Sequence, residues 1–360
     1  MALKIALACG GTGGHVFPAL AVGQILSKEH GIDCALFGRA GSLEERLALK
    51  AGVRFVAIPA IPLHRAHPWR NLALPAHLLH ALGAARAALK REAVDGVFAT
   101  GGYVSLPTGL AASLLGKPLW LLEPNAHAGV ANRLLGGRAR RVFAGSPAAG
   151  AGFKPARTEI TGNPVRPLDG RTRDELRASL GVAPDEQFLL VLGGSQGAHG
   201  INEMLSKESR RLTESGWKIL WQTGEREFEL RRSLARGITG VQVESFLHDV
   251  YAALGAADLC VSRSGAGAVA ELALHGLPTV LVPYPHATDN HQETNARELE
   301  EAGAGVVLTE RAYGDGLLKR SIDALWSNRQ KAARALFAFS RPDAASHIAS
   351  RIAGDLGARP

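Results

Sequence analysis

The sequence predicts an α/β protein that contains two domains of mostly parallel sheet. Its 360 residues exceed the usual size of one hydrophobic core. Short continuous apolar runs alternate with helix-like segments, as in parallel sheets that are covered on both faces. Each half also opens with a strand followed by a glycine loop, at residues 3–14 and 188–197. We interpret these halves as two Rossmann-like domains that face a central cleft.

The first half contains four apolar runs that predict buried strands. They lie at residues 3–9, 94–100, 117–122 and 141–144, and Asp33 stands at the start of a further strand. A helix is expected at residues 18–28, with Pro18 near its first turn. Prolines at positions 164 and 167 punctuate the chain, so we place the domains at residues 1–163 and 164–343.

The second half repeats this alternation. A helix is expected at residues 171–180, and strands are expected at residues 188–192, 218–222, 241–244, 259–262 and 279–283. Residues 287–295 are rich in polar side chains, which predicts a loop before a helix at residues 296–302. This loop follows a strand, and open α/β sheets bind ligands at the carboxyl ends of their strands.

The composition indicates an anionic partner. Lysine and arginine number 41 against 33 acidic residues, which gives a net charge of +8. The basic residues are spread along the chain and aromatic residues make up 6%, so no base-stacking surface, and hence no nucleic-acid partner, is expected. The three cysteines are far apart, which favours a reducing cytoplasm over a disulfide framework. No run reaches the roughly 18 apolar residues that a membrane span requires.

Four glycine-containing junctions between a strand and a helix predict phosphate binding. They lie at residues 10–14, 100–102, 193–197 and 264–267. Glycine lets backbone N–H groups approach a ligand, and a helix N-terminus favours an anion. A single loop of this kind is as readily a tight turn that binds nothing, but four in one chain favour binding. No loop matches a P-loop, and none fits the dinucleotide fingerprint well, so a sugar nucleotide is favoured over NAD.

Glu271 follows the fourth loop by about one helical turn. A carboxylate there can accept hydrogen bonds from a ribose diol, although acids are also common near helix N-termini. The histidines and acids of residues 286–293 match no metal-binding spacing, so no metal site is expected.

Seven segments together resemble the MurG family, the bacterial N-acetylglucosaminyltransferases that make lipid II. The segments occur in family order between residues 3 and about 305, at residues 10–18, 100–105, 123–125, 162–166, 193–198, 263–271 and 289–296. The resemblance implies a GT-B fold in which the last helix, within residues 344–360, returns to the N-terminal domain. It also implies an inverting transfer of GlcNAc from UDP-GlcNAc to the MurNAc 4-hydroxyl of lipid I.

The resemblance further implies where the substrates bind. The acceptor would bind the N-terminal domain at the cytoplasmic face of the cell membrane, peripherally, and the donor would bind the C-terminal domain. No cofactor and no metal are implied. The implied substrate-binding residues are Thr12, Gly13, Gly14 and Asn125 in the first half, Arg166 and Ser195 for the diphosphate, Leu247 for the uracil, Ala266, Gly267, Ala268, Val269, Ala270 and Glu271 for the diphosphate and ribose, and Gln292 for the sugar.

Two positions depart from the family pattern. Pro124 stands where the family often has glutamine, which removes a backbone donor, and Ala268 stands where a hydroxyl residue is common. Donor contacts from these positions are therefore expected to be fewer.

The candidate catalytic residues are His15, Glu123 and Asn125. His15 ends the first glycine loop, and imidazole titrates near neutral pH, so His15 is our candidate base. A histidine that only fixes the loop by hydrogen bonding is the alternative, and Glu123 is the alternative base.

Residues 64–91 predict contact with an anionic membrane surface. Trp69 and several leucines stand beside basic residues there, and a second basic cluster comprises Arg138, Arg140 and Arg141. An ordinary amphipathic helix would explain the same pattern. For the whole chain, the alternatives are another GT-B activity, such as a diacylglycerol glycosyltransferase or UDP-GlcNAc 2-epimerase, or a nucleotide- or nucleic-acid-binding module.

Overall fold

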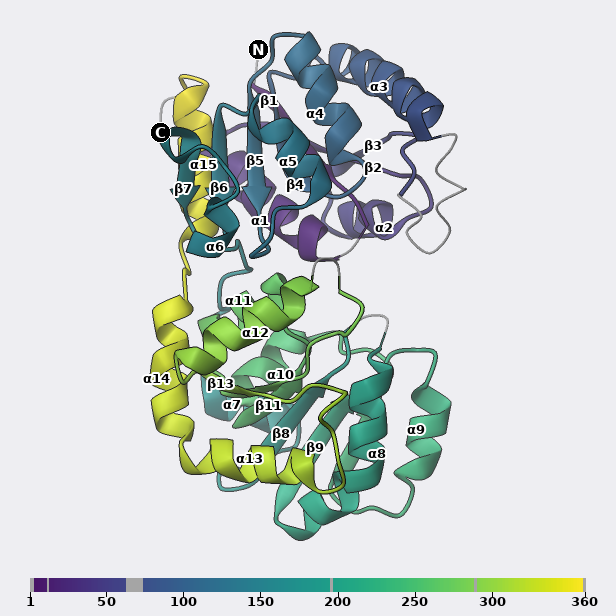
Figure 1. The fold of residues 1–360 in the computed structure, drawn as a ribbon, viewed down its shortest axis with the longest axis vertical. Helices are drawn as coiled ribbons and strands as arrows, with labels where there is room; N and C mark the ends of the chain where they lie inside the picture. Colours follow the sequence, from purple (N-terminus) through teal and green to yellow (C-terminus); the bar gives the residue numbers. More distant parts are fainter. Residues whose placement is uncertain (1–2, 12, 63–73, 195–196, 288–289, 359–360) are drawn as a thin grey trace. The chain divides into compact units, whose positions relative to one another are not determined.

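The chain forms two compact units, each built around one parallel sheet. The computed structural model describes residues 3–11, 13–62, 74–194, 197–287 and 290–358 (Figure 1). Unit 1 comprises Met1–Arg166 and Arg341–Pro360, and unit 2 comprises Pro167–Ser340. All strand pairs in both sheets are parallel, so the predicted fold class is confirmed.

The sheet of unit 1 has seven strands in the order β3-β2-β1-β4-β5-β6-β7. The strands are β1 Lys4–Cys9, β2 Asp33–Gly38, β3 Arg54–Ala57, β4 Gly96–Gly101, β5 Leu119–Glu123, β6 Arg141–Ala144 and β7 Thr158–Ile160. The order reverses between β1 and β4, which is where open α/β sheets bind their ligands. Strands β3 and β7 are not predicted from the sequence, because they are short edge strands with few buried residues.

The helices of unit 1 cover both faces of its sheet. They are α1 Gly13–His30, α2 Leu43–Lys50, α3 Leu74–Arg91, α4 Ser105–Leu114, α5 Val130–Gly136, α6 Pro147–Gly150, the 3-10 helix η2 Pro155–Arg157, and α15 Ala344–Asp355. The predicted start of α1 at residue 18 is wrong, because the glycine loop continues directly into the helix and Pro18 lies inside it. Because Pro18 has no backbone N–H, the helix lacks the hydrogen bond that residue 18 would donate to the carbonyl of residue 14.

Alternate residues of β1 face opposite layers, as the pleat requires. Ile5 and Leu7 pack with α1 and α15, whereas Ala6 and Ala8 face the layer that contains α3, α4 and α5. Burial on both faces explains why the central strands read as continuous apolar runs.

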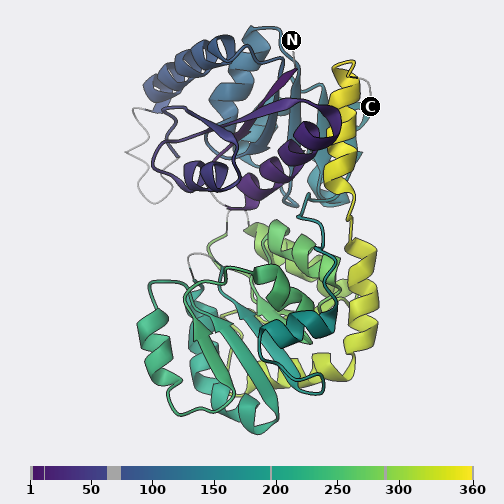
Figure 2. The same ribbon diagram turned by 180° about the vertical axis from the view of Figure 1, so that it is seen from behind.

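Helix α15 completes unit 1 although the whole of unit 2 precedes it in sequence. It packs beside α1 (Figure 2). Its Asp355 carboxylate is 6% exposed and accepts bonds from Arg141 Nε at 2.9 Å, Arg141 Nη2 at 3.0 Å and Trp120 Nε1 at 2.9 Å. Near the middle of the helix, Arg351 pairs with Glu159 at 3.1 Å. Strands β5, β6 and β7 are thus all tied to α15.

The sheet of unit 2 has six strands in the order β10-β9-β8-β11-β12-β13. The strands are β8 Gln187–Leu192, β9 Trp217–Gln222, β10 Val241–Glu244, β11 Leu259–Ser262, β12 Thr279–Leu281 and β13 Gly305–Val307. The helices are α7 Arg173–Ser179, α8 His199–Glu214, α9 Phe228–Leu234, α10 Val250–Ala256, α11 Ala266–His275, α12 His291–Glu301, α13 Leu317–Ser327 and α14 Arg329–Phe339. Helices α8 and α13 pack on one face of this sheet.

The predicted loop at residues 287–295 is only partly a loop. Helix α12 already begins at His291, after Asn290 in the left-handed conformation. The polar residues from 291 onward therefore form the first turn and a half of a helix rather than irregular backbone.

His275 is a half-buried histidine at the C-terminal end of α11. Its ring stacks edge-on against Tyr251 at 5.3 Å, and no described residue bonds its Nε2. Burial lowers the pKa of His275 to about 4, and the charge of Asp169 opposes this shift only weakly. Unit 2 therefore holds this imidazole neutral at pH values where an unfolded chain would protonate it.

We expect Asp355→Asn to loosen α15. An amide cannot replace the charge-assisted bonds to Arg141, so the free energy for opening this helix should fall by about 2 kcal/mol. Amide hydrogen exchange across α15 measures this quantity. Asp343→Asn is the matched control, because Asp343 starts the same helix without a side-chain cap bond. Equal exchange in the two variants would contradict the anchoring role.

We expect His275 to make unit 2 sensitive to mild acid. A depressed folded-state pKa contributes stability above pH 6.5 that is lost as the pH falls from 6.5 towards 4. The urea midpoint of the wild type should therefore fall more steeply between pH 7 and pH 5 than that of His275→Gln. Parallel profiles for the two proteins would refute this assignment.

Candidate functional site

The fold brings the four glycine loops together in pairs. Strands β1 and β4 are neighbours in unit 1, and β8 and β11 are neighbours in unit 2. The loops at residues 10–14 and 100–102 therefore lie side by side at one switch point, and those at 193–197 and 264–267 lie side by side at the other. Each loop leads into a helix, namely α1, α4, α8 or α11.

In unit 1 the backbones of the two loops approach each other closely at Gly10 and Gly102. A Cβ atom on Gly102 would lie 1.9 Å from the carbonyl oxygen of Gly10. Gly102 also has φ +83°, a conformation that side chains disfavour. Glycine is thus required at this position on two independent grounds.

His15 lies where these loops meet. Its Nδ1 is 2.7 Å from the carbonyl oxygen of Thr100, and the Thr100 hydroxyl donates to the His15 carbonyl at 2.7 Å. A Cβ atom on Gly101 would lie 2.8 Å from the imidazole ring. Because a carbonyl oxygen only accepts, the neutral ring carries its proton on Nδ1 and its basic lone pair on Nε2. Thr100 thus sets the tautomer, a role that the sequence motif does not reveal.

Glu123 is buried at the end of β5 and engaged with its own loop. It is 1% exposed, and its carboxylate accepts bonds from the Asn125 N–H at 3.0 Å, Asn125 Nδ2 at 3.3 Å, the Gly129 N–H at 2.9 Å and Asn132 Nδ2 at 2.9 Å. These donors leave Glu123 poorly placed to take a proton from a substrate. The geometry therefore favours His15 over Glu123 as a base, and makes Asn125 a side chain that Glu123 orients.

A second loop supports residues 123–125. Asn163 Nδ2 donates to the Pro124 carbonyl at 3.1 Å, which links the segment after β7 to the segment after β5. Pro124 is buried, so at this position it serves as an acceptor within unit 1. Arg166 is exposed at the end of this segment. Among the predicted residues, Gly13 and Gly14 begin α1, whereas Thr12 and Ser195 lie outside the described residues.

In unit 2 the glycine loop after β8 rests on the end of β9. A Cβ atom on Gly197 would lie 2.4 Å from the Thr223 carbonyl oxygen, and Gly197 has φ +78°. Gln222 Nε2 donates to the carbonyls of Gly194 at 2.8 Å and Ser245 at 3.2 Å. Gln222 thereby joins the glycine loop to the segment that contains the half-buried Leu247.

The fourth loop and Gln292 also come together. Ser264 Oγ donates to the Gln292 carbonyl at 2.7 Å, and Asn295 Nδ2 donates to the Ser264 carbonyl at 3.0 Å. The Gln292 side-chain oxygen accepts from the Tyr284 N–H at 3.0 Å. The N-cap residue of α11 is Gly265, which has no side chain that could accept a hydrogen bond from the first turn of the helix. That turn contains Ala266, Gly267, Ala268 and Val269, and Ala270 and half-buried Glu271 follow.

Arg263 organises the segment that follows β12. Its Nη1 donates to the carbonyls of Val282 and Pro283 at 3.1 Å each, and pairs with Glu310 at 2.7 Å. The guanidinium also lies 5.4 Å from the centre of the Tyr284 ring. Sequence reasoning included Arg263 in a motif without giving it this role, because its partners follow two other strands.

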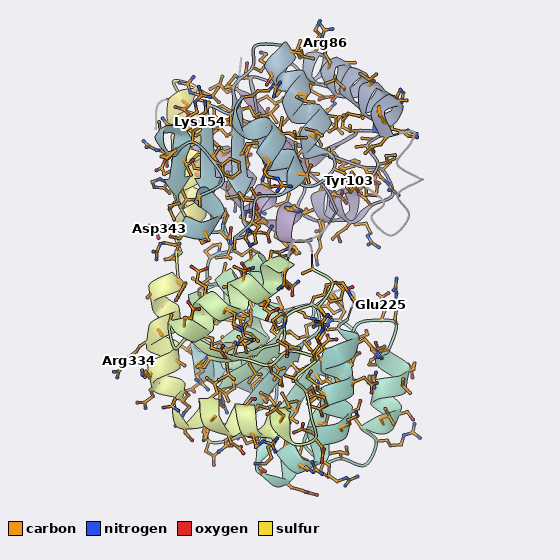
Figure 3. All side chains as sticks on the ribbon, in the orientation of Figure 1. Arg86, Tyr103, Lys154, Glu225, Arg334 and Asp343 are labelled. Atoms are coloured by element: carbon orange, nitrogen blue, oxygen red, sulfur yellow. The ribbon has the colours of Figure 1, made fainter. Side chains whose placement is uncertain are left out.

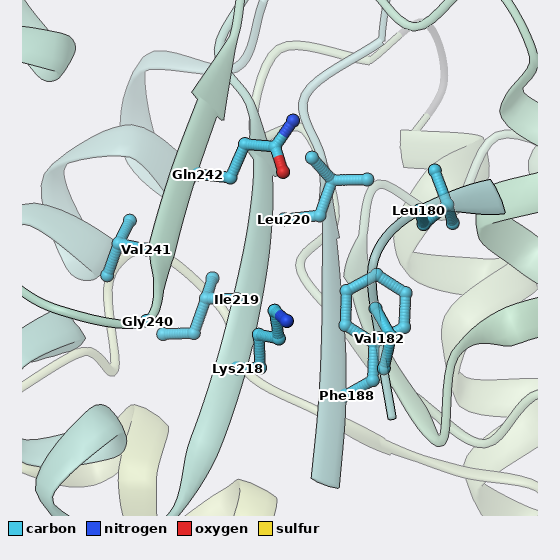
Figure 4. A pocket seen from close by; sticks show the side chains of 9 residues that line it. All are labelled: Leu180, Val182, Phe188, Lys218, Ile219, Leu220, Gly240, Val241 and Gln242. Atoms are coloured by element: carbon cyan, nitrogen blue, oxygen red, sulfur yellow. The ribbon is translucent and has the colours of Figure 1, made fainter. Parts of the chain in front are cut away.

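An apolar pocket of about 210 Å³ lies elsewhere in unit 2 (Figure 4). It is lined by Phe188, Leu220 and Val241 among others, near the amino ends of β8, β9 and β10. The glycine loops follow the carboxyl ends of the strands, so this pocket is not part of the predicted site.

The surface of α3 exposes both apolar and basic groups. Leu79 is 69% exposed, and Lys90 is exposed on the same helix. Arg86 is also exposed there (Figure 3). The second predicted cluster is less available, because Arg140 and Arg141 both pair with Asp355. Residues 63–73, which include Trp69, lie outside the described residues.

Within the part of the chain that the structure describes, no three histidine, cysteine or acidic side chains are grouped so that they could hold a metal ion. No helix there is long and apolar enough to cross a bilayer.

Both halves of the chain match models of one protein family. The glycosyltransferase family 28 N-terminal domain matches residues 5–144, and the family 28 C-terminal domain matches residues 188–348. A protein of Moorella thermoacetica is 38% identical over 360 residues, which cover 96% of this chain and 97% of the relative. Its name is UDP-N-acetylglucosamine–N-acetylmuramyl-(pentapeptide) pyrophosphoryl-undecaprenol N-acetylglucosamine transferase.

Solved glycosyltransferase structures match the fold of nearly the whole chain. The crystal structure of Acinetobacter baumannii MurG superposes with a TM-score of 0.77 at 31% identity, and the match covers 97% of this chain and 99% of that one. CalG4, the calicheamicin glycosyltransferase, superposes with a TM-score of 0.72 at 17% identity over 99% of this chain and 98% of its own, a likeness of fold alone. These neighbours and the two parallel sheets confirm the predicted GT-B fold.

Proposed function

The chain belongs to glycosyltransferase family 28, and from this we propose that it transfers GlcNAc from UDP-GlcNAc to undecaprenyl-pyrophosphoryl-MurNAc-pentapeptide. The observation that carries the proposal is the nearly full-length likeness to the Moorella protein, whose name states this reaction. The resemblance to MurG that the sequence motifs predict is confirmed by the same comparison and by the Acinetobacter structure.

The donor binds unit 2 in this proposal. The N-termini of α8 and α11 follow the paired glycine loops and carry the partial positive charge that suits a diphosphate. Glu271, on the second turn of α11, accepts hydrogen bonds from the ribose hydroxyls, and the segment of Leu247 meets the uracil. Gln292, which Ser264 and Tyr284 hold beside the fourth loop, contacts the sugar.

The acceptor binds unit 1 in this proposal, and His15 is the base. Its Nε2 takes the proton of the MurNAc 4-hydroxyl while that oxygen forms a bond to the anomeric carbon of GlcNAc. The bond between this carbon and the diphosphate oxygen breaks, and UDP leaves with the electron pair, so the anomeric centre inverts. The contact between Nδ1 and Thr100 keeps the lone pair on Nε2 before transfer and stabilises the imidazolium afterwards.

Unit 1 also meets an anionic membrane surface in this proposal. A polyprenyl acceptor resides in the bilayer, and α3 exposes Leu79 as well as the basic side chains of Arg86 and Lys90. Basic residues near an anionic surface contribute about 1 kcal/mol each, and an apolar side chain adds its burial. The protein accordingly works as a peripheral enzyme at the cytoplasmic face of the cell membrane.

The proposed reaction is tested by radiolabelled GlcNAc transfer from UDP-GlcNAc to a short-chain lipid I analogue in the presence of EDTA. We expect labelled product only when acceptor is present. Consumption of UDP-GlcNAc without acceptor would indicate an epimerase, and no turnover with either substrate set would overturn the proposal.

His15→Ala should lower kcat by roughly 10²- to 10⁴-fold, because it removes the base from the transition state. The KM for UDP-GlcNAc should stay within about twofold, since the donor is held by unit 2. His30→Gln, at the other end of the same helix, is the control and should retain turnover. Near-normal turnover of His15→Ala would leave His15 only the loop-fixing role.

Leu79→Glu should weaken binding to phosphatidylglycerol vesicles about tenfold at low salt, because burying a leucine contributes about 1.5 kcal/mol or more. Leu49→Glu is the matched control, since Leu49 is 68% exposed on α2 against 69% for Leu79. Vesicle co-sedimentation measures the effect. Equal binding of both variants would place the membrane surface elsewhere.

A further inference from the structure

A buried carboxylate joins the two glycine loops of unit 1. Glu44 is the second residue of α2 and is 1% exposed. Its Oε1 accepts a bond from the Gly11 N–H at 3.0 Å and another from the Tyr103 hydroxyl at 3.0 Å. Gly11 belongs to the loop after β1 and Tyr103 follows the loop after β4, so one oxygen atom bridges both.

The backbone around Glu44 leaves room for this bridge. A Cβ atom on Gly10 would lie 3.2 Å from Glu44 Oε1, and one on Gly38 would lie 2.9 Å from Glu44 Cβ. Larger side chains at either position would displace the carboxylate. The two glycines thus serve the placement of Glu44 as well as the turns in which they stand.

The surroundings of Glu44 and Tyr103 determine the protonation states of both side chains. Burial acts to raise the pKa of Glu44, but the bonds from Ser42, Gly11 and Tyr103 outweigh it and lower the pKa below its usual value. Burial and the bond to Glu44 raise the pKa of Tyr103 to about 12. At neutral pH, Glu44 is therefore an anion and Tyr103 a hydroxyl donor.

The bridged segments flank His15 on both sides. Gly11 lies four residues before His15, and Tyr103 lies two residues after Gly101, where a Cβ atom would lie 2.8 Å from the His15 ring. A shift of either loop would move the imidazole or its Thr100 partner. The bridge therefore acts on the proposed base without touching it.

We propose that Glu44 and Tyr103 are positioning residues for the transfer reaction, which together hold the two glycine loops in the arrangement that aims His15 Nε2. The inference rests on the proposed function, because it assigns His15 as the base. It also limits how the first loop binds an anion: the Gly11 N–H is already bonded to Glu44, so any phosphate at this loop is met by the amides that follow it.

The test uses three variants of the full chain, Glu44→Gln, Tyr103→Phe and the double variant. Tyr103→Phe keeps the ring and removes only the bridging hydroxyl. We expect kcat to fall by roughly 10- to 100-fold in each single variant, because small misplacements of a reacting group cost this much. The KM for UDP-GlcNAc should stay within about twofold. The double variant should fall little below the worse single variant, since both changes break one bridge.

Glu45→Gln is the matched control, because Glu45 is the next residue and, among the residues that the structure describes, bonds only to the exposed Gly41 N–H. It should retain wild-type kcat. A readout independent of turnover is the amide proton shift of Gly11 in labelled protein. Its resonance should move upfield in Glu44→Gln, where the acceptor loses its charge, and should not move in Glu45→Gln.

The outcomes separate this inference from the proposed function. A wild-type enzyme without acceptor-dependent transfer would overturn both. An active wild type whose Glu44→Gln and Tyr103→Phe variants keep normal kcat would overturn the inference alone. Additive losses in the double variant, or an unchanged Gly11 resonance, would also overturn it, because the two side chains would then not act through one bridge.

Discussion

The contact between Gly102 and the Gly10 carbonyl is the constraint on which the site of unit 1 depends. No side chain fits between these two backbone segments, so the ends of β1 and β4 approach as closely as main chains can. Buried Ser105 reinforces the turn, since its hydroxyl lies 2.7 Å from the Gly101 carbonyl and 2.9 Å from the Ala8 carbonyl. The reciprocal bonds of Thr100 and His15 and the bridge at Glu44 are possible only at this separation. The described contacts of Thr100 with His15, and the bridge at Glu44, thus depend on this close approach of the two backbone segments.

Unit 2 reaches a comparable arrangement by different contacts. There the loop after β8 packs on the end of β9, and Gln222 supplies the bonds that a buried acid supplies in unit 1. Its second loop is held from the other side, by Ser264, Asn295 and the segment that Arg263 fixes. The two halves share a topology and a use of glycine. The side chains that support the loops are specific to each half.

The sequence predicts the strongly buried parts of this protein and misses the parts that depend on long-range pairing. Strands β6 and β11 are largely buried and have the predicted bounds, because an apolar run between turns has one stable placement in a parallel sheet. The edge strand β10 also has its predicted bounds, although it is partly exposed. Strands β3, β7 and β13 are short and partly exposed, so their hydrogen bonds come from neighbours that no local pattern reveals. His15 is predicted because it ends a glycine loop. Glu44 is not, because its partners are 33 and 59 residues away.

Because α15 belongs to unit 1 but follows unit 2 in sequence, unit 1 can be completed only after unit 2 has been synthesised. Trp120 and Arg141 are made early, but Asp355, their shared partner, follows after all of Pro167–Ser340. At roughly 5–20 residues per second, translation of that insert takes on the order of 10–35 s. Throughout this interval the nascent unit 1 lacks α15, whose buried residues belong to the same core cluster as Leu20 and Val22 of α1. The half that leaves the ribosome first is therefore the half that finishes folding last, and it exposes an apolar face to chaperones in the meantime.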